Sequence, residues 1–117
     1  MAHRIDGRKL GRRHGARMAL YRNLTVSVLR YEKIRTTEAK AKEVRGQIER
    51  VIALAKRGDL TARRAVRSEF PNEPLVISKL FDEIAPKYAD RTSGFTRIVR
   101  VGQRAGDAAE IVQLELV

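Results

Sequence analysis

KIRTTEAKAKEVRGQIERVIALAKRG, residues Lys33 to Gly58, predicts a strand that leads directly into a long helix. Its first five residues, KIRTT, are rich in β-branched side chains, with Ile34 between polar neighbours, which favours a single strand. Thr37 also suits the N-cap position of a following helix, because its hydroxyl can accept a hydrogen bond from a free backbone N–H. Glu38 then lies where the helix dipole favours a negative charge.

The helix predicted after Thr37 has one apolar face and a clear C-terminal end. Its apolar residues recur at spacings of three and four, as on one side of an α-helix. They are Ala41, Val44, Ile48, Val51, Ile52 and Ala55. Lys56 and Arg57 place cations at the negative end of the helix, and Gly58 can adopt the left-handed conformation that ends many helices.

Helical patterns also flank this segment on both sides. From Ala16 to Tyr31 the sequence predicts an amphipathic helix of about four turns. Its apolar face would hold Met18, Leu20, Tyr21, Leu24, Val28, Leu29 and Tyr31. After the central helix, Asp59 can cap a third helix that runs to about Phe70 and is closed by Pro71.

A fourth helix is expected, with Asn72 as its N-cap, Pro74 in its first turn and Pro86 at its end. Its inward-facing residues would be Leu75, Val76, Leu80, Phe81 and Ile84. The tail differs, because FTRIVRV (95–101) and EIVQLELV (110–117) read as strands, joined by the glycine-containing turn GQRAGDAA (102–109).

The element order therefore predicts an α+β fold: a helix, a strand, three helices and two strands in two layers. The chain of 117 residues has no Cys, which excludes disulfides and thiolate chemistry and suits a reducing compartment. It also has no Trp, so its core must be mostly aliphatic. Its longest apolar run, Val51 to Ala55, is far shorter than the ~20 residues that span a bilayer. We expect a flexible basic arm (residues 1–15) followed by one globular domain (residues 16–117).

The positive charge is concentrated at the start of the chain. The net charge is +11, and residues 1–22 contain seven cations against one acid. GRKLGRRHGAR, Gly7 to Arg17, has three glycines and little apolar surface, so it is expected to remain disordered unless a polyanion binds it. Arginine pairs with phosphates and stacks on bases, and a bendable arm suits folded RNA. The alternatives for this segment are a solvated tail, binding to an acidic protein, binding to an anionic membrane, and a transit peptide. The glycines disfavour a transit peptide. The lack of an apolar anchor disfavours membrane binding.

The sequence offers no constellation for catalysis or for a resident metal or cofactor. Both histidines, His3 and His14, lie in the basic arm, and Asp82 and Glu83 are adjacent on a predicted helix and point about 100° apart. No phosphate-binding loop motif is present. We therefore expect neither an enzyme, nor a cofactor, nor a small-molecule substrate.

Several blocks of the chain resemble the family of bacterial large-subunit ribosomal protein seventeen. They are RKLGR (8–12), RNL (22–24), IRTTEAKAKEVR (34–45), LAKRGDL (54–60), KLFDEIAPKYADR (79–91), GFTRIVRVGQRAGDAA (94–109) and the final LELV. The resemblance implies a cytoplasmic, structural component of the large subunit that binds its RNA, touches neighbouring ribosomal proteins near the exit of the polypeptide tunnel and needs no cofactor. The same order of elements is expected from the family.

Together, the charge pattern and the resemblance give a set of candidate RNA contacts in two clusters. The first, in the arm and the first helix, comprises Arg4, Arg8, Lys9, Arg12, Arg13, His14, Arg17 and Arg22. The second, around the hairpin, comprises Arg91, Thr96, Arg97 and Arg104. Three rival interpretations remain: a DNA-binding or nucleoid-type protein, an enzyme that acts on RNA, and a protein-interaction domain with an incidental basic tail.

Overall fold

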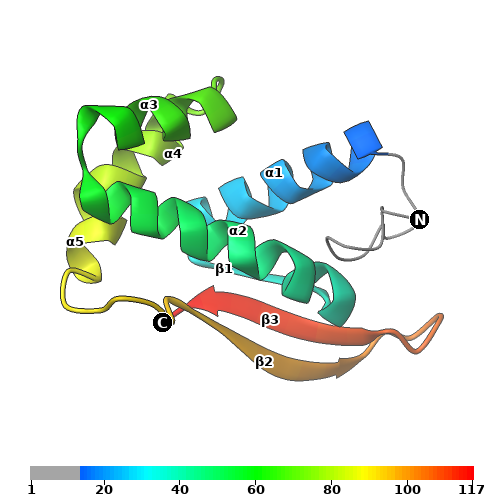
Figure 1. The fold of residues 1–117 in the computed structure, drawn as a ribbon. Helices are drawn as coiled ribbons and strands as arrows, with labels where there is room; N and C mark the ends of the chain where they lie inside the picture. The colour runs from blue at the N-terminus through cyan, green and yellow to red at the C-terminus, as the bar shows by residue number, and fades with distance from the viewer. Residues whose placement is uncertain (1–13) are drawn as a thin grey trace, which may run out of the picture.

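The computed structural model describes residues 14–117 and shows an α+β fold of two layers (Figure 1). The elements are α1 (His14–Tyr31), β1 (Lys33–Thr37), α2 (Glu38–Arg57), α3 (Leu60–Glu69), α4 (Pro74–Lys79), the π-helical turn η2 (Leu80–Ile84), α5 (Ala85–Lys87), β2 (Thr96–Gln103) and β3 (Glu110–Leu116). Because α4, η2 and α5 follow one another without a break, they form one helical segment. Within residues 14–117 the predicted order of a helix, a strand, three helices and two strands is therefore confirmed.

Helix α2 is bounded as the sequence predicts. The Thr37 hydroxyl accepts a hydrogen bond from the Lys40 backbone N–H at 3.4 Å, and Glu38 occupies the first turn. At the other end Gly58 has a φ of 65°, and its N–H donates to the Leu54 carbonyl at 3.3 Å. All six residues of the predicted apolar stripe are buried, so this helix is the central support of the fold.

The three strands form one antiparallel sheet in the order β1-β3-β2. Strand β3 is central, and its register places Leu114 opposite Ile34 on β1 and opposite Ile98 on β2. A bulge interrupts the β2–β3 pairing between Arg100 and Gly102, and the hairpin then continues to Gln103. Strand β2 thus extends two residues beyond the predicted Val101.

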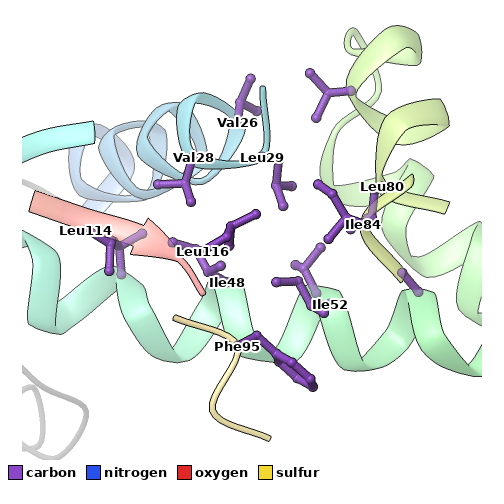
Figure 2. Packing of buried hydrophobic residues seen from close by; sticks show 14 of the residues in the cluster. Val26, Val28, Leu29, Ile48, Ile52, Leu80, Ile84, Phe95, Leu114 and Leu116 are labelled. Atoms are coloured by element: carbon purple, nitrogen blue, oxygen red, sulfur yellow. The ribbon is translucent and has the colours of Figure 1, made fainter. Parts of the chain in front are cut away.

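The core lies between the sheet and the helices (Figure 2). Four elements contribute pairs of buried side chains: Val28 and Leu29 from α1, Ile48 and Ile52 from α2, Leu80 and Ile84 from η2, and Leu114 and Leu116 from β3. Phe95, just before β2, packs on the ring of Tyr88 with the centroids 5.2 Å apart. Because every element adds residues to one cluster, residues 14–117 are held together by a single core.

Helix α1 differs from its predicted form in its start and in the residues that it buries. It begins at His14, two residues before Ala16, so that Gly15 lies in its first turn. Met18 and Tyr31, predicted to face inward, are 36% and 64% exposed, whereas Thr25 and Val26 are buried. Thr25 is accommodated because its hydroxyl donates to the Tyr21 carbonyl at 2.8 Å.

The fourth predicted helix also needs three corrections. Its N-cap residue is Glu73 rather than Asn72, and Leu75 is 83% exposed instead of facing the core. The helical segment also continues past Pro86 to Lys87. A proline removes one N–H and needs space on the preceding turn, and the wide π-helical turn immediately before α5 provides that space.

Candidate nucleic-acid interface

The described part of the predicted basic arm is the start of α1. Arg4, Arg8, Lys9, Arg12 and Arg13 lie outside the described residues, and His14 is the first residue of α1. That first turn, blue in Figure 1, lies at the same end of the molecule as the turn between β2 and β3. Of the second predicted cluster, Arg104 lies in that turn, whereas Arg91, Thr96 and Arg97 lie at the other end of the hairpin, where the chain enters β2.

Beyond His14, the two other predicted contact residues on α1 have different surroundings. Arg22 is exposed and lines an open groove of about 470 Å³ that α1 forms with α2 and α3; Met18, Tyr21, Gln47, Arg50 and Glu69 complete its lining. Burial, followed by the charge of Glu43, raises the pKa of Tyr21, and the positive charge of the half-buried Arg17 partly offsets this increase. Arg22 is thus available to a ligand, whereas Arg17 also belongs to the packing of α1.

The arginines of the β2–β3 hairpin are paired with acids of the same hairpin or of α2. Arg97 forms an ion pair with Glu115 at 2.7 Å, and the Arg104 guanidinium binds both carboxylate oxygens of Asp107 at 3.0 and 2.5 Å. Arg100 lies 3.4 Å from Glu38 and 3.6 Å from Glu110. These hairpin cations therefore already have anionic partners within the chain.

These ion pairs affect the pKa values of the acids. The Arg104 hydrogen bonds, followed by the Ala109 N–H, lower the pKa of Asp107 to about 2. The Arg97 hydrogen bond, followed by that of Gln113, lowers the pKa of Glu115. Both carboxylates are consequently ionised at neutral pH and partly neutralise the arginines beside them.

The hairpin is not basic by composition. Residues 96–116 contain three arginines and three acids, and therefore carry no net charge. The predicted second cluster contains Arg97 and Arg104 but not their acidic neighbours. An anion that binds Arg97 or Arg104 must compete with Glu115 or Asp107.

Arg91 and Thr96 lie at the entry to the hairpin and contribute to its structure. The Arg91 side chain donates to the Gly94 carbonyl at 3.1 Å, with its guanidinium carbon 5.8 Å from the centre of the Tyr88 ring. Thr96 is only 4% exposed, and its hydroxyl donates to Glu49 at 2.7 Å and accepts from Arg45 at 3.1 Å. Arg91 remains exposed, whereas Thr96 is buried with its hydroxyl occupied, so we assign Thr96 a structural role.

Two exposed cations that were absent from the predicted contacts lie on β1. Residues on one strand alternate between the two faces of a sheet, and directly paired residues of neighbouring strands share a face. Lys33 pairs with Glu115 and Arg35 with Gln113, so these four residues lie opposite the buried Leu114 and away from the core. The alternation in KIRTT, with Ile34 inward, could have identified Lys33 and Arg35 as outward-facing from the sequence.

The described residues offer no alternative chemistry. Within residues 14–117 no group of three His, Asp or Glu side chains could hold a metal ion. None of the helices described here has the length and apolar character needed to cross a membrane. Among residues 14–117, the exposed cations are the feature of this surface that suggests a nucleic-acid ligand.

Comparisons with known proteins place this arrangement among ribosomal proteins. The family model for ribosomal protein L17 matches residues 20–117. A Clostridium botulinum protein named large ribosomal subunit protein bL17 is 58% identical over 110 residues, covering 94% of this chain and 96% of the relative. A protein of the same name from Desulfitobacterium hafniense is 56% identical over 110 residues, covering 94% of this chain and 97% of the relative.

Proposed function

The chain belongs to the ribosomal protein L17 family, and from that premise we propose that it binds large-subunit ribosomal RNA through its basic N-terminal segment, with the hairpin as a second contact. It is a structural component of the large ribosomal subunit in the bacterial cytoplasm and not an enzyme. Neighbouring proteins of the subunit are its other partners.

The observation that carries the RNA-binding proposal is the position of the charge. Residues 1–22 hold more than half of the net charge of +11, and the described part of that segment begins α1 at the same end as the hairpin turn. A dense row of cations gains free energy from a polyanion by releasing the counterions condensed on it. The folded residues then serve to hold the basic segment and the hairpin at a common RNA surface.

The hairpin would act by exchange rather than by simple attraction. Arg97 and Arg104 each begin with a carboxylate partner, so a phosphate must replace Glu115 or Asp107 to bind them. Binding of a phosphate by such an exchange is less favourable in free energy than binding of a phosphate to a cation that has no carboxylate partner. We therefore propose that the N-terminal segment supplies most of the affinity and that the hairpin adds geometric selectivity.

The salt dependence of binding to purified large-subunit ribosomal RNA tests the proposal. If about eight phosphates are engaged, log K should fall with log salt with a slope of about −6 to −7. A flat salt response would contradict RNA binding through charge. Duplex DNA that competes equally at matched salt would instead support a general DNA-binding protein.

A triple variant, Arg8→Ala with Arg12→Ala and Arg13→Ala, tests the contribution of the N-terminal segment. We expect the slope to become less negative by about 2 to 3, because three phosphate contacts are lost. Arg17 is left unchanged because it is half-buried on α1. The control replaces Lys40, Arg64 and Arg67 by Ala, which removes the same charge from α2 and α3; an equal effect of both variants would refute a specific role of the N-terminal segment.

A further inference from the structure

The sheet has one face covered by helices and one that faces away from them. Helices α1 and α2 pack on the covered face, whose inward residues include Ile34, Ile98 and Leu114 (Figure 1). We call the opposite side the outer sheet face. From the register of the three strands it carries Lys33, Arg35, Thr37, Arg97, Val99, Gly102, Ile111, Gln113 and Glu115.

These residues are arranged in three rows across the sheet, and the third row is Thr37, Ile111 and Gly102. One row is Lys33, Glu115 and Arg97, and the next is Arg35, Gln113 and Val99. The rows follow from direct cross-strand pairing, in which paired side chains stand beside each other on one face. The outer sheet face is thus a mainly polar surface with three cations and one acid.

The acid is already neutralised within the first row. Glu115 accepts from Arg97 at 2.7 Å and from Gln113 at 2.9 Å, and its pKa is lowered mainly by Arg97 and least by Lys33. Lys33 and Arg35 are exposed, and neither forms an ion pair with any of residues 14–117 that the structure describes. The outer sheet face therefore presents a net charge of about +2, located on β1.

The spacing of the two β1 cations suits a phosphate backbone. Residues i and i+2 of a strand are about 6.6 to 6.8 Å apart and point to the same face. Consecutive phosphates along an RNA strand are separated by a similar distance, so Lys33 and Arg35 can each meet one. Gln113 lies beside Arg35 and has an amide oxygen that can accept a hydrogen bond from a ribose hydroxyl.

A protein partner fits this surface less well. Protein interfaces are usually centred on aromatic and large apolar side chains. The apolar side chains here are small in number: Val99 is 40% exposed, Val101 at the β2 bulge is 46% exposed, Ile111 is half-buried, and no aromatic residue belongs to the rows. Two exposed cations that form no ion pair with residues 14–117, on a mainly polar surface, match a polyanion.

We propose that the outer sheet face binds the phosphate backbone of large-subunit ribosomal RNA as a site separate from the N-terminal segment, with Lys33 and Arg35 as its phosphate-binding residues. The inference rests on the proposed function, because it assumes that this RNA is the partner. It assigns a role to β1, which connects α1 to α2 and belongs to neither predicted cluster.

Charge removal from β1 provides the first test. The variant Lys33→Gln with Arg35→Gln should bind purified large-subunit ribosomal RNA about tenfold more weakly at 0.1 M salt, with a slope less negative by about 1.4 to 1.8. The matched control, Arg64→Gln with Arg67→Gln, removes the same charge from exposed positions of α3 and should change binding much less. Equal effects of the two variants, or no effect of either, would overturn the inference.

A second test locates the RNA directly and does not depend on affinity. Because the chain has no cysteine, Val99→Cys creates a single attachment point for iron–EDTA on the outer sheet face, and Ser78→Cys creates one on α4. Radicals from residue 99 should cleave the bound RNA at defined positions, whereas those from residue 78 should not give the same cuts. If residue 99 gives no cleavage in a complex that still shows the steep salt response, the sheet-face site alone is refuted. If binding of the unmodified chain shows a flat salt response, RNA binding is refuted altogether.

Discussion

The carboxylate of Glu49 on α2 accepts hydrogen bonds from both the backbone N–H and the hydroxyl of Thr96, at 2.9 and 2.7 Å. Its other oxygen accepts from the N–H groups of Gly94 and Phe95, at 3.1 and 3.2 Å. One helical side chain thus holds the three residues with which the chain enters β2. Hydrogen bonds to a charged acceptor contribute more to stability than neutral ones.

Glu49→Gln should therefore lower the free energy of unfolding by about 2 kcal/mol, because one oxygen is replaced by an amide that cannot accept from these N–H groups. Urea unfolding measures the change. Glu83→Gln is the control, since Glu83 is exposed on η2, and it should alter stability by less than about 0.5 kcal/mol. Equal stability of the two variants would show that the Glu49 contacts contribute nothing.

Two glycines of the central helix should respond to alanine with opposite signs. Gly58 has a φ of 65°, where a Cβ is strained, so Gly58→Ala should destabilise the protein by about 1 kcal/mol. Gly46 is exposed in the middle of α2 and a Cβ there would meet nothing within 4 Å, so Gly46→Ala should stabilise it by about 0.5 to 1 kcal/mol. Thermal unfolding of both variants would reveal the pair of shifts, and shifts of the same sign would contradict the assignment of Gly58 as the end of α2.

Neighbouring residues of α4 should differ strongly in their importance. Val76 is 3% exposed, and Val76→Ala should cost about 1.5 to 3 kcal/mol through lost burial and a cavity. Leu75 is 83% exposed, so Leu75→Ser should change the free energy of unfolding by no more than about 0.5 kcal/mol. Chemical denaturation decides the matter: a large loss for Leu75→Ser would mean that this side chain is covered in solution.

The Arg104–Asp107 ion pair in the hairpin turn should shift the titration midpoint of Asp107 to lower pH. Arg104 and the Ala109 N–H lower the pKa of Asp107 to about 2, so the stabilising effect of this ionised carboxylate is complete above about pH 4 and is lost as the pH falls toward 2. Carboxyl-carbon NMR follows that titration. In Arg104→Gln the midpoint should rise toward the ordinary aspartate value of about 3.9; an unchanged midpoint would exclude Arg104 as the cause.

The sequence predicts an element well where several local signals agree. Helix α2 has a capping threonine, a regular apolar stripe and a terminal glycine, and each is found as predicted. Helix α4 has six residues before η2, which is too few for spacing alone to determine which side faces the core, and Leu75 was therefore placed inward incorrectly. Its continuation past Pro86 depends on a π-helical turn that has no clear sequence signal.

The candidate interface was less predictable because it depends on partners that are distant in the chain. Arg97 was identified as a cation, but its pairing with Glu115, 18 residues later, follows from the register of the hairpin. Thr96 was expected to contact RNA, whereas its hydroxyl is directed to Glu49, 47 residues earlier. Composition identifies charges, and only the fold shows which of them are already neutralised.

Thr37 is both the last residue of β1 and the N-cap of α2, so no connecting loop separates the sheet from the central helix. A protease has no exposed linker to cut at this junction, and an inserted residue would shift either the cap or the strand register. Circular permutation should accordingly fail here and be tolerated better in the exposed turn at 104–108. The junction makes strand and helix one mechanical unit, able to transmit a force on the sheet to the helical layer.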